Sequence, residues 1–170
     1  MKTLADWPPR ASDTTATIQA YERVLGWLLI AGSTLMSQDR AIAELKARPS
    51  TGLSTSCSAF DAVTVSHAVG IETMVLLDRS GLGPVPCLIA QTDQAVLLMQ
   101  PGTGGSLARL EGVSVESGPG GRLGLPPSSS RRWDTPPWDI RSRRALSLLA
   151  GSELVPYVRD ARRLFGGQTP

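Results

Sequence analysis

The sequence predicts a single α+β domain in which helices flank a mixed, mostly antiparallel sheet. At 170 residues, 41% of them hydrophobic, the chain has the size and apolar content of one folded domain. Its 17 Gly and 13 Pro indicate many turns and short elements, which argues against a helical bundle or a coiled coil. Short apolar runs of strand character alternate with capped helical segments, as is typical of α+β folds.

The domain, residues 1–170, divides into a helical part (1–50), a sheet core (51–128) and a basic segment rich in Pro and Trp (129–170). In the first part, Ser12 or Asp13 can cap a helix that ends near Gly26. The apolar run at 28–31 favours a short buried strand. Ser37 can cap a second short helix, which Pro49 stops.

The predicted sheet core centres on the apolar, β-branched run at 60–65. Ser66 ends this strand and caps a helix, which stops at the Gly-Leu-Gly-Pro sequence of 81–84. Residues 85–90 and 94–99 are strand-like and are joined by a polar hairpin turn. Two further short strands are expected at 113–116 and 123–125, with a tight glycine loop at 118–121 between them.

After the sheet core, residues 126–137 are predicted to be irregular because Pro, Ser and Arg dominate them. A final amphipathic helix is expected to begin at a Ser152 cap, with Pro156 in its first turn.

Positive charge is concentrated towards the end of the chain. Residues 1–121 hold 8 basic and 11 acidic side chains, whereas residues 122–170 hold 9 arginines and 4 acidic side chains. The planar guanidinium suits phosphate recognition, although a run of charge is also the ordinary composition of a solvated face. The candidate nucleic-acid-binding residues are Arg122, Arg131, Arg132, Trp133, Arg141, Arg143 and Arg144.

Trp133 and Trp138 stand among these arginines and beside Pro136 and Pro137. Aromatic rings next to positive charge are what binders of single-stranded nucleic acid use for stacking. A tryptophan beside proline also commonly packs an irregular segment onto a core. Both interpretations stay open, and the packing interpretation is favoured.

Other motifs are predicted to be structural or absent. Cys57 and Cys87 lack a nearby second cysteine for a zinc site and are expected to be buried. The most apolar run, 24–36, is too short for a bilayer, which needs about 20 residues. We therefore expect no membrane partner and a cytoplasmic location.

Side chains for two-metal phosphoryl transfer are missing from the central strand. Such sites need two or three carboxylates that converge on divalent ions. This strand supplies only Asp61, while Thr64 and Ser66 carry neutral hydroxyls. His67, the single histidine, has no carboxylate in the four residues after it and is expected to be an ordinary residue at a helix start.

Five short motifs follow one another between residues 41 and 138. They are a helix and Arg-Pro before a Thr-Gly turn (41–52), a Phe-Asp-hydrophobic strand (60–65), a helix ending in Leu-Gly-Pro-Val (82–85), a strand ending in Pro-Gly (94–102), and a glycine-rich turn leading to Pro-Pro-Ser (118–128) with a Trp soon after. In this order the chain resembles the small actinobacterial branch of the bifunctional DNA primase/polymerase N-terminal domain.

The resemblance implies an archaeo-eukaryotic primase-like fold that binds nucleotide and template and joins nucleotides with two metal ions. On this chain the family's acids would fall at Thr64, Ser66 and near Ser114, and its second-motif histidine within 94–99, where none exists. These positions are all neutral. Because each carboxylate of such a site stabilises the transition state strongly, their loss implies lost catalysis.

The sequence therefore predicts a primase-polymerase-like domain that has lost its catalytic metal ligands and acts as a nucleic-acid or protein binding module. The expected partners are DNA or RNA, a protein, or a second copy of the chain, and no cofactor is expected. One alternative is an active DNA primase/polymerase that binds Mg²⁺ or Mn²⁺ through Asp61, Asp78 and Glu116. Another alternative is a protein–protein adaptor without nucleic acid.

Overall fold

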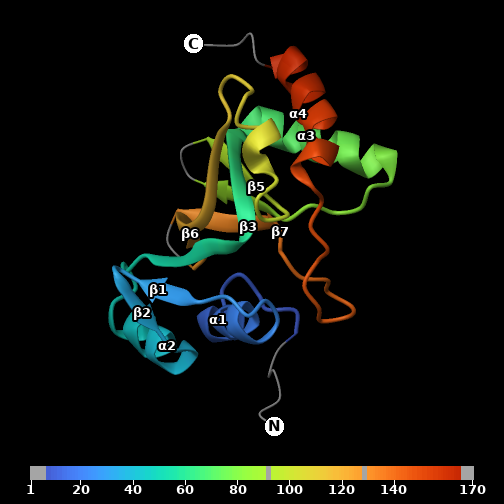
Figure 1. The fold of residues 1–170 in the computed structure, drawn as a ribbon. Coiled ribbons are helices and arrows are strands. Elements are labelled where there is room, and N and C mark those ends of the chain that lie inside the picture. Colours follow the sequence, from blue (N-terminus) through green and yellow to red (C-terminus); the bar gives the residue numbers. More distant parts are fainter. Residues whose placement is uncertain (1–6, 91–92, 128–129, 166–170) are drawn as a thin grey trace.

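Helices and strands alternate along the part of the chain that the computed structural model describes, residues 7–90, 93–127 and 130–165 (Figure 1). The helices are α1 (Thr14–Arg23), α2 (Gln38–Ala47), α3 (His67–Ser80) and α4 (Gly151–Phe165), with a short 3-10 helix, η1 (Gly104–Ser106). The strands are β1 (Leu29–Ala31), β2 (Thr34–Met36), β3 (Leu53–Ser66), β4 (Cys87–Ala90), β5 (Gln94–Met99), β6 (Ser114–Leu125) and β7 (Arg131–Thr135). Each pairing between these strands is antiparallel, so the predicted α+β fold with a mostly antiparallel sheet is confirmed.

Strand β3 is the long central strand of the sheet. Its first residues pair with β1 and its last residues with β5, while β6 pairs with both ends of β3. The strand order is β2-β1-β3-β5-β4-β7, with β6 on the remaining edge of β3. The predicted strand at 60–65 is therefore only the second half of a longer strand. Its first half contains the polar residues Ser54, Ser56 and Ser58, so a search for apolar runs does not detect it.

The two faces of the sheet carry two separate hydrophobic cores, because successive side chains of a strand point to opposite faces. Phe60 and Ala62 of β3 belong to the core that contains α1 and Trp27. Val63 and Val65 belong to the core beneath α3 and α4. In Figure 1, α3 and α4 accordingly lie on one side of the sheet, and α1 and α2 on the other.

The first three helices begin directly after the residues that predict them, Asp13, Ser37 and Ser66, although the Ser37 side chain makes no capping hydrogen bond. The Asp13 carboxylate accepts a hydrogen bond from the Ala16 N–H at the start of α1. The Ser66 hydroxyl accepts one from the Val69 N–H at the start of α3. α3 ends at Gly81, whose φ of 74° is left-handed, a conformation that glycine adopts at little cost.

Two segments rich in glycine or proline form strands where the sequence predicts loops. Residues 118–121 lie inside β6, which is irregular there and continues to Leu125. Gly118, at φ 70°, permits the bulge. Residues 131–135 pair with β4 as β7, so 126–137 is not irregular throughout. In β6 only Gly118 of this segment has a cross-strand partner, Cys57, and the register resumes at Arg122, so 119–121 form the bulge. In β7, pairing with β4 outweighs the local preference for turns.

The start of α4 also differs from the prediction. The helix begins at Gly151, one residue before the expected Ser152 cap, and Pro156 falls inside it. The Gly151 N–H donates to the Thr103 hydroxyl at 2.8 Å, and a Cβ at Gly151 would lie 2.1 Å from the Thr103 carbonyl oxygen. The loop before η1 therefore requires glycine at this helix start.

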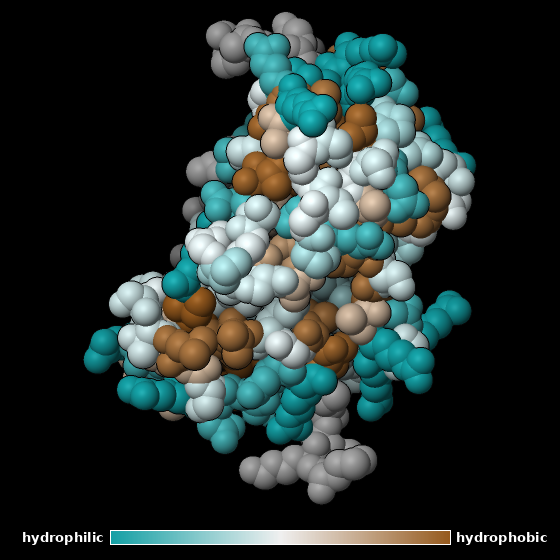
Figure 2. All heavy atoms as spheres, in the orientation of Figure 1, coloured by the Kyte–Doolittle hydropathy of each residue, from teal (hydrophilic) through white to brown (hydrophobic). Residues whose placement is uncertain are grey.

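The surface view shows hydrophobic side chains gathered over the hairpin of β1 and β2 (Figure 2). Leu28 is 62% exposed and Leu35 is 59% exposed. Strand β2 also lies at one edge of the sheet. Among the residues described, no helix has the length and apolar character needed to cross a membrane.

Cys57 and Cys87 are buried free thiols, as predicted. Burial raises the pKa of Cys57 to about 11 and that of Cys87 to about 12. Because the thiolate is the reactive form, we expect neither cysteine to react with iodoacetamide near neutral pH in the folded protein, and both to react in guanidinium chloride. Mass spectrometry of the labelled protein measures this, and equal labelling in the two states would contradict it.

Candidate functional site

Three hydroxyl side chains meet at one end of the sheet. Thr64 and Ser66 lie at the end of β3, and Ser114, at the start of β6, is the cross-strand partner of Thr64. Cross-strand partners, and residues two apart on one strand, project from the same face. All three line one open surface hollow of about 500 Å³. The structure thus brings together the three positions that, by the resemblance, would carry metal-binding acids.

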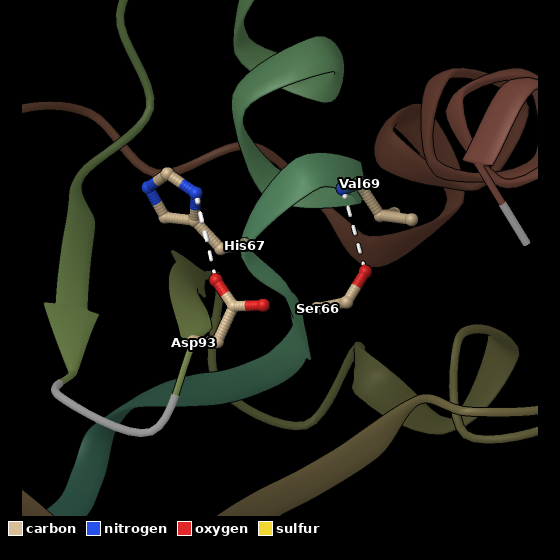
Figure 3. A network of polar contacts seen from close by, with 4 residues as sticks. All are labelled: Ser66, His67, Val69 and Asp93. Atoms are coloured by element: carbon tan, nitrogen blue, oxygen red, sulfur yellow. Dashed lines mark hydrogen bonds and ion pairs between the residues drawn. The ribbon is translucent and has the colours of Figure 1, made fainter. Parts of the chain in front are cut away.

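The charged residue in this hollow is Asp93, and none of the described arginines lines it. Asp93 lies next to His67, whose Nδ1 is 3.9 Å from Asp93 Oδ1 (Figure 3). The His67 N–H also donates to the Asp93 carbonyl oxygen at 2.9 Å. Sequence reasoning missed this pair because it considered only neighbours along the chain, whereas the pairing of Ser66 with Gln94 brings Asp93 to His67.

His67 and Asp93 do not form a catalytic relay with Ser66. The Ser66 hydroxyl points towards the Val69 N–H, on the other side of the helix start from the imidazole (Figure 3). It therefore caps α3 and is not held by a base, as a nucleophilic serine would be.

Asp61, the weak catalytic candidate, is a buried structural residue. Its side chain points to the face opposite Thr64 and is 2% exposed. Asp61 Oδ1 accepts a hydrogen bond from the Gly102 N–H at 3.0 Å, and Oδ2 accepts one from the Gly104 N–H at 2.7 Å. A Cβ at Gly104 would lie 2.9 Å from Asp61 Oδ2, so the loop approaches the carboxylate closely. Both oxygens hold the loop between β5 and η1.

The acids of the enzyme alternative do not converge. Glu116 is exposed on β6 opposite Ala62, on the other face of the sheet from Asp61. Asp78 lies near the end of α3, beside a different groove. Within the described ranges, no group of three His, Cys, Asp or Glu side chains is placed to hold a metal ion.

Arg131 is the candidate arginine that the sheet register brings nearest the hollow. Ser66 pairs with Gln94, Gln94 with Ala90, and Ala90 with Arg131, so these residues form one row across the sheet. The Arg131 guanidinium packs against Gly124, where a Cβ would lie 2.5 Å from its Cζ. Arg131 is therefore half-buried against β6 and does not project freely into solvent.

The arginines differ in how their charge is balanced. Arg132 Nη1 lies 3.9 Å from Asp134 Oδ1, and Arg162 of α4 lies 3.8 Å from Glu111. Five candidate arginines have no carboxylate at ion-pair distance among the residues placed by the structure: Arg122, Arg131, Arg141, Arg143 and Arg144.

Both tryptophans of the basic segment pack inwards, as the packing interpretation predicts. Trp133 Nε1 donates to the Tyr21 hydroxyl at 2.8 Å, and that hydroxyl donates to the Pro126 carbonyl oxygen at 2.9 Å. Trp138 is 4% exposed and its ring lies 6.0 Å from that of Trp7. Trp133 is therefore a half-buried member of an aromatic cluster.

Residues 139–144, between β7 and α4, form a projecting loop, coloured orange in Figure 1. We name it the arginine loop because it presents Arg141, Arg143 and Arg144, all exposed. Ile140 lies in the same loop and is 54% exposed. In the surface view, hydrophilic side chains project around it (Figure 2).

Comparison of the chain with protein-family models, with curated proteins and with solved structures found no match.

Proposed function

We propose that this chain is a non-catalytic, primase-polymerase-like domain that binds nucleic acid through exposed arginines. The observation that carries the proposal is the shared hollow of Thr64, Ser66 and Ser114. Thr64 and Ser66 are neighbours on β3, and Ser114, which is distant in the sequence, joins them through the pairing of β3 with β6, as the resemblance requires. Their meeting supports a scaffold of this family in which hydroxyls replace the acids.

Neutral hydroxyls cannot take the place of carboxylates in a two-metal site, because such sites depend on anionic ligands to concentrate and orient the ions. Asp93 adds a single carboxylate to the hollow. Outside the hollow, the chain carries positive charge on the five arginines that have no carboxylate partner among the described residues. These features favour binding over phosphoryl transfer and suit a cytoplasmic protein with access to nucleic acid.

We expect the protein to bind short labelled DNA and RNA with an affinity that falls steeply as salt is added. For three to five phosphate contacts, the slope of log affinity against log salt is about −2.7 to −4.5 on duplex DNA. Fluorescence anisotropy at several salt concentrations measures it. Absence of binding to every nucleic acid at low salt would contradict the proposal, and primer extension with Mg²⁺ or Mn²⁺ would contradict its non-catalytic half.

The protein–protein adaptor remains a second candidate because of the exposed Leu28 and Leu35 on the β1–β2 hairpin. Apolar side chains that cluster on a surface are typical of interaction sites. The same titration separates the two candidates, since an adaptor of this kind has no salt-dependent affinity for nucleic acid.

A further inference from the structure

The geometry points to the arginine loop, 139–144, as a preformed clamp for the phosphate backbone of double-stranded DNA, with Asp139 as the positioning residue that orders it. This inference rests on the proposed function and names its contact site and its preferred ligand.

Hydrogen bonds to Asp139 hold the loop in one shape. The Asp139 N–H donates to the Arg144 carbonyl oxygen at 2.8 Å, and the Arg143 N–H donates to the Asp139 carbonyl oxygen at 3.1 Å. The side chain closes the same turn, because Asp139 Oδ1 accepts from the backbone N–H groups of Arg141 and Ser142. These bonds, led by the one from Ser142, hold the pKa of Asp139 below its usual value. The carboxylate is therefore ionised at neutral pH.

The base of the loop is anchored to the protein. Trp138 and Ala145 form an antiparallel bridge across it, and the Leu146 N–H donates to the Pro137 carbonyl oxygen at 3.0 Å. The Trp7 indole N–H donates to the Ile140 carbonyl oxygen. Because hydrogen bonds hold the loop at its base and in its turn, it loses little conformational entropy when a ligand binds. This favours affinity.

Arg143 has a φ of 58°, in the left-handed region where glycine or asparagine is the usual residue. Residues held in this region store backbone strain, and such positions concentrate at ligand-binding sites. The backbone therefore adopts an unfavourable conformation at a position that carries a guanidinium.

The three arginines of this loop lack the carboxylate partners that several arginines of β7 and α4 have. Arg132 has Asp134 beside it, and Arg162 and Arg163 of α4 pair with Glu111 and Asp160. The one acid in the arginine loop, Asp139, uses its carboxylate on backbone N–H groups. The Arg141 charge also favours the ionised form of Asp139, but none of the three guanidinium groups lies at ion-pair distance from a described carboxylate. They can therefore contact phosphate, the anion that suits their planar geometry.

Duplex DNA is the favoured ligand because the loop offers no ring on which a base could stack. Proteins that bind single strands combine charge with aromatic stacking. Across the described ranges no aromatic side chain is fully exposed, and Trp138 at the base of the loop is buried. Duplex DNA carries the greater linear charge density, so a clamp made only of arginines favours it.

The decisive experiment compares D139A with D139N by anisotropy on one labelled duplex and on one of its strands. Both variants remove the same negative charge, and charge alone predicts equal, tighter binding for both. Asparagine keeps an oxygen that can accept the loop N–H groups, whereas alanine does not. We expect D139A to bind duplex several-fold more weakly than D139N. Equal affinity of the two variants, or tighter binding by D139A, would overturn the role of Asp139.

The triple variant R141Q/R143Q/R144Q tests the contact itself, with R159Q/R162Q/R163Q on α4 as a control of equal charge change. We expect the loop variant to lose about tenfold in duplex affinity and part of the salt slope, and the control to lose much less. Equal losses in both variants, or tighter binding of the single strand by the wild type, would overturn the inference while leaving the proposed function intact. A wild-type protein that binds neither probe would overturn both.

Discussion

Replacing Asp61 with alanine is expected to lower the free energy of unfolding by about 3–5 kcal/mol, since each hydrogen bond to a charged group contributes roughly 1.5–3 kcal/mol. The Gly102 and Gly104 N–H groups both depend on this carboxylate, and the Gly104 N–H is buried with it. For a domain of this size the melting temperature should fall by about 6–20 °C. Calorimetry or urea unfolding measures the change.

The matched control is Glu116→Ala, which removes a carboxylate that is exposed on β6. We expect its effect to lie within about 0.5 kcal/mol, as is usual for surface substitutions. Asp61→Asn should fall between the two, because one amide oxygen replaces two acceptors. An Asp61→Ala variant of wild-type stability would contradict the structural role of this side chain.

This prediction bears directly on the enzyme alternative. Loss of an activity in Asp61→Ala would ordinarily be read as loss of a metal ligand. Here the same substitution is expected to loosen the loop that holds the start of α4, through Thr103 and Gly151. Activity that survives in Asp61→Asn at reduced stability would indicate that the residue acts on the fold and not on a metal.

Replacing Tyr21 with phenylalanine is expected to lower the free energy of unfolding by about 2–3 kcal/mol, because the change leaves two buried or half-buried polar groups without a hydrogen-bond partner. The Trp133 indole N–H loses its acceptor, and the Pro126 carbonyl loses its donor. Tyr21 is itself fully buried against Trp27 and Trp138. Urea unfolding gives the change in stability, and near-ultraviolet circular dichroism reports the altered surroundings of the tryptophans.

Tyr157→Phe on α4 is the control, since Tyr157 is half-buried and its hydroxyl lies outside this aromatic cluster. Equal stabilities of the two variants would contradict the importance of the Tyr21 network. Burial raises the pKa of Tyr21 above its usual value, with the Trp133 hydrogen bond acting in the opposite sense. The unfolded chain then ionises first, so stability should fall as the pH rises above about 10. Phenolate absorbance should show Tyr21 ionising only as the protein unfolds.

Local signals in the sequence predict the helices well because a helix end is a local event. Asp13 and Ser66 each cap a helix with their own side-chain oxygens. The apolar strands were found for a similar reason, since β-branched runs favour extended backbone. The strand at 131–135 is not predicted because it depends on pairing with β4, a strand far away in the sequence. The glycines of 118–121 do form an irregular turn, but it interrupts a longer strand, β6, that pairing with β3 defines.

In the candidate site, too, some features could be predicted from the sequence, and others depend on contacts between distant residues. The grouping of Thr64, Ser66 and Ser114 was expected from the resemblance, and the register of β3 with β6 brings them together. The role of Asp61 could not be predicted, because its partners are backbone N–H groups that a sequence does not distinguish. The shape of the arginine loop likewise depends on hydrogen bonds from the backbone to Asp139, whereas the sequence indicates only the positive charge of the loop.

The length of β3 has a consequence for how the protein folds. This one strand supplies Phe60 and Ala62 to one core and Val63 and Val65 to the other. Neither core can be completed without it, so the two cores should melt in a single cooperative transition. Its partners β5 and β6 lie far along the chain, and contacts between distant segments slow folding. The parts of the chain that surround the two cores are therefore not separable folding units. A fragment that contains the elements of only one core should remain unfolded.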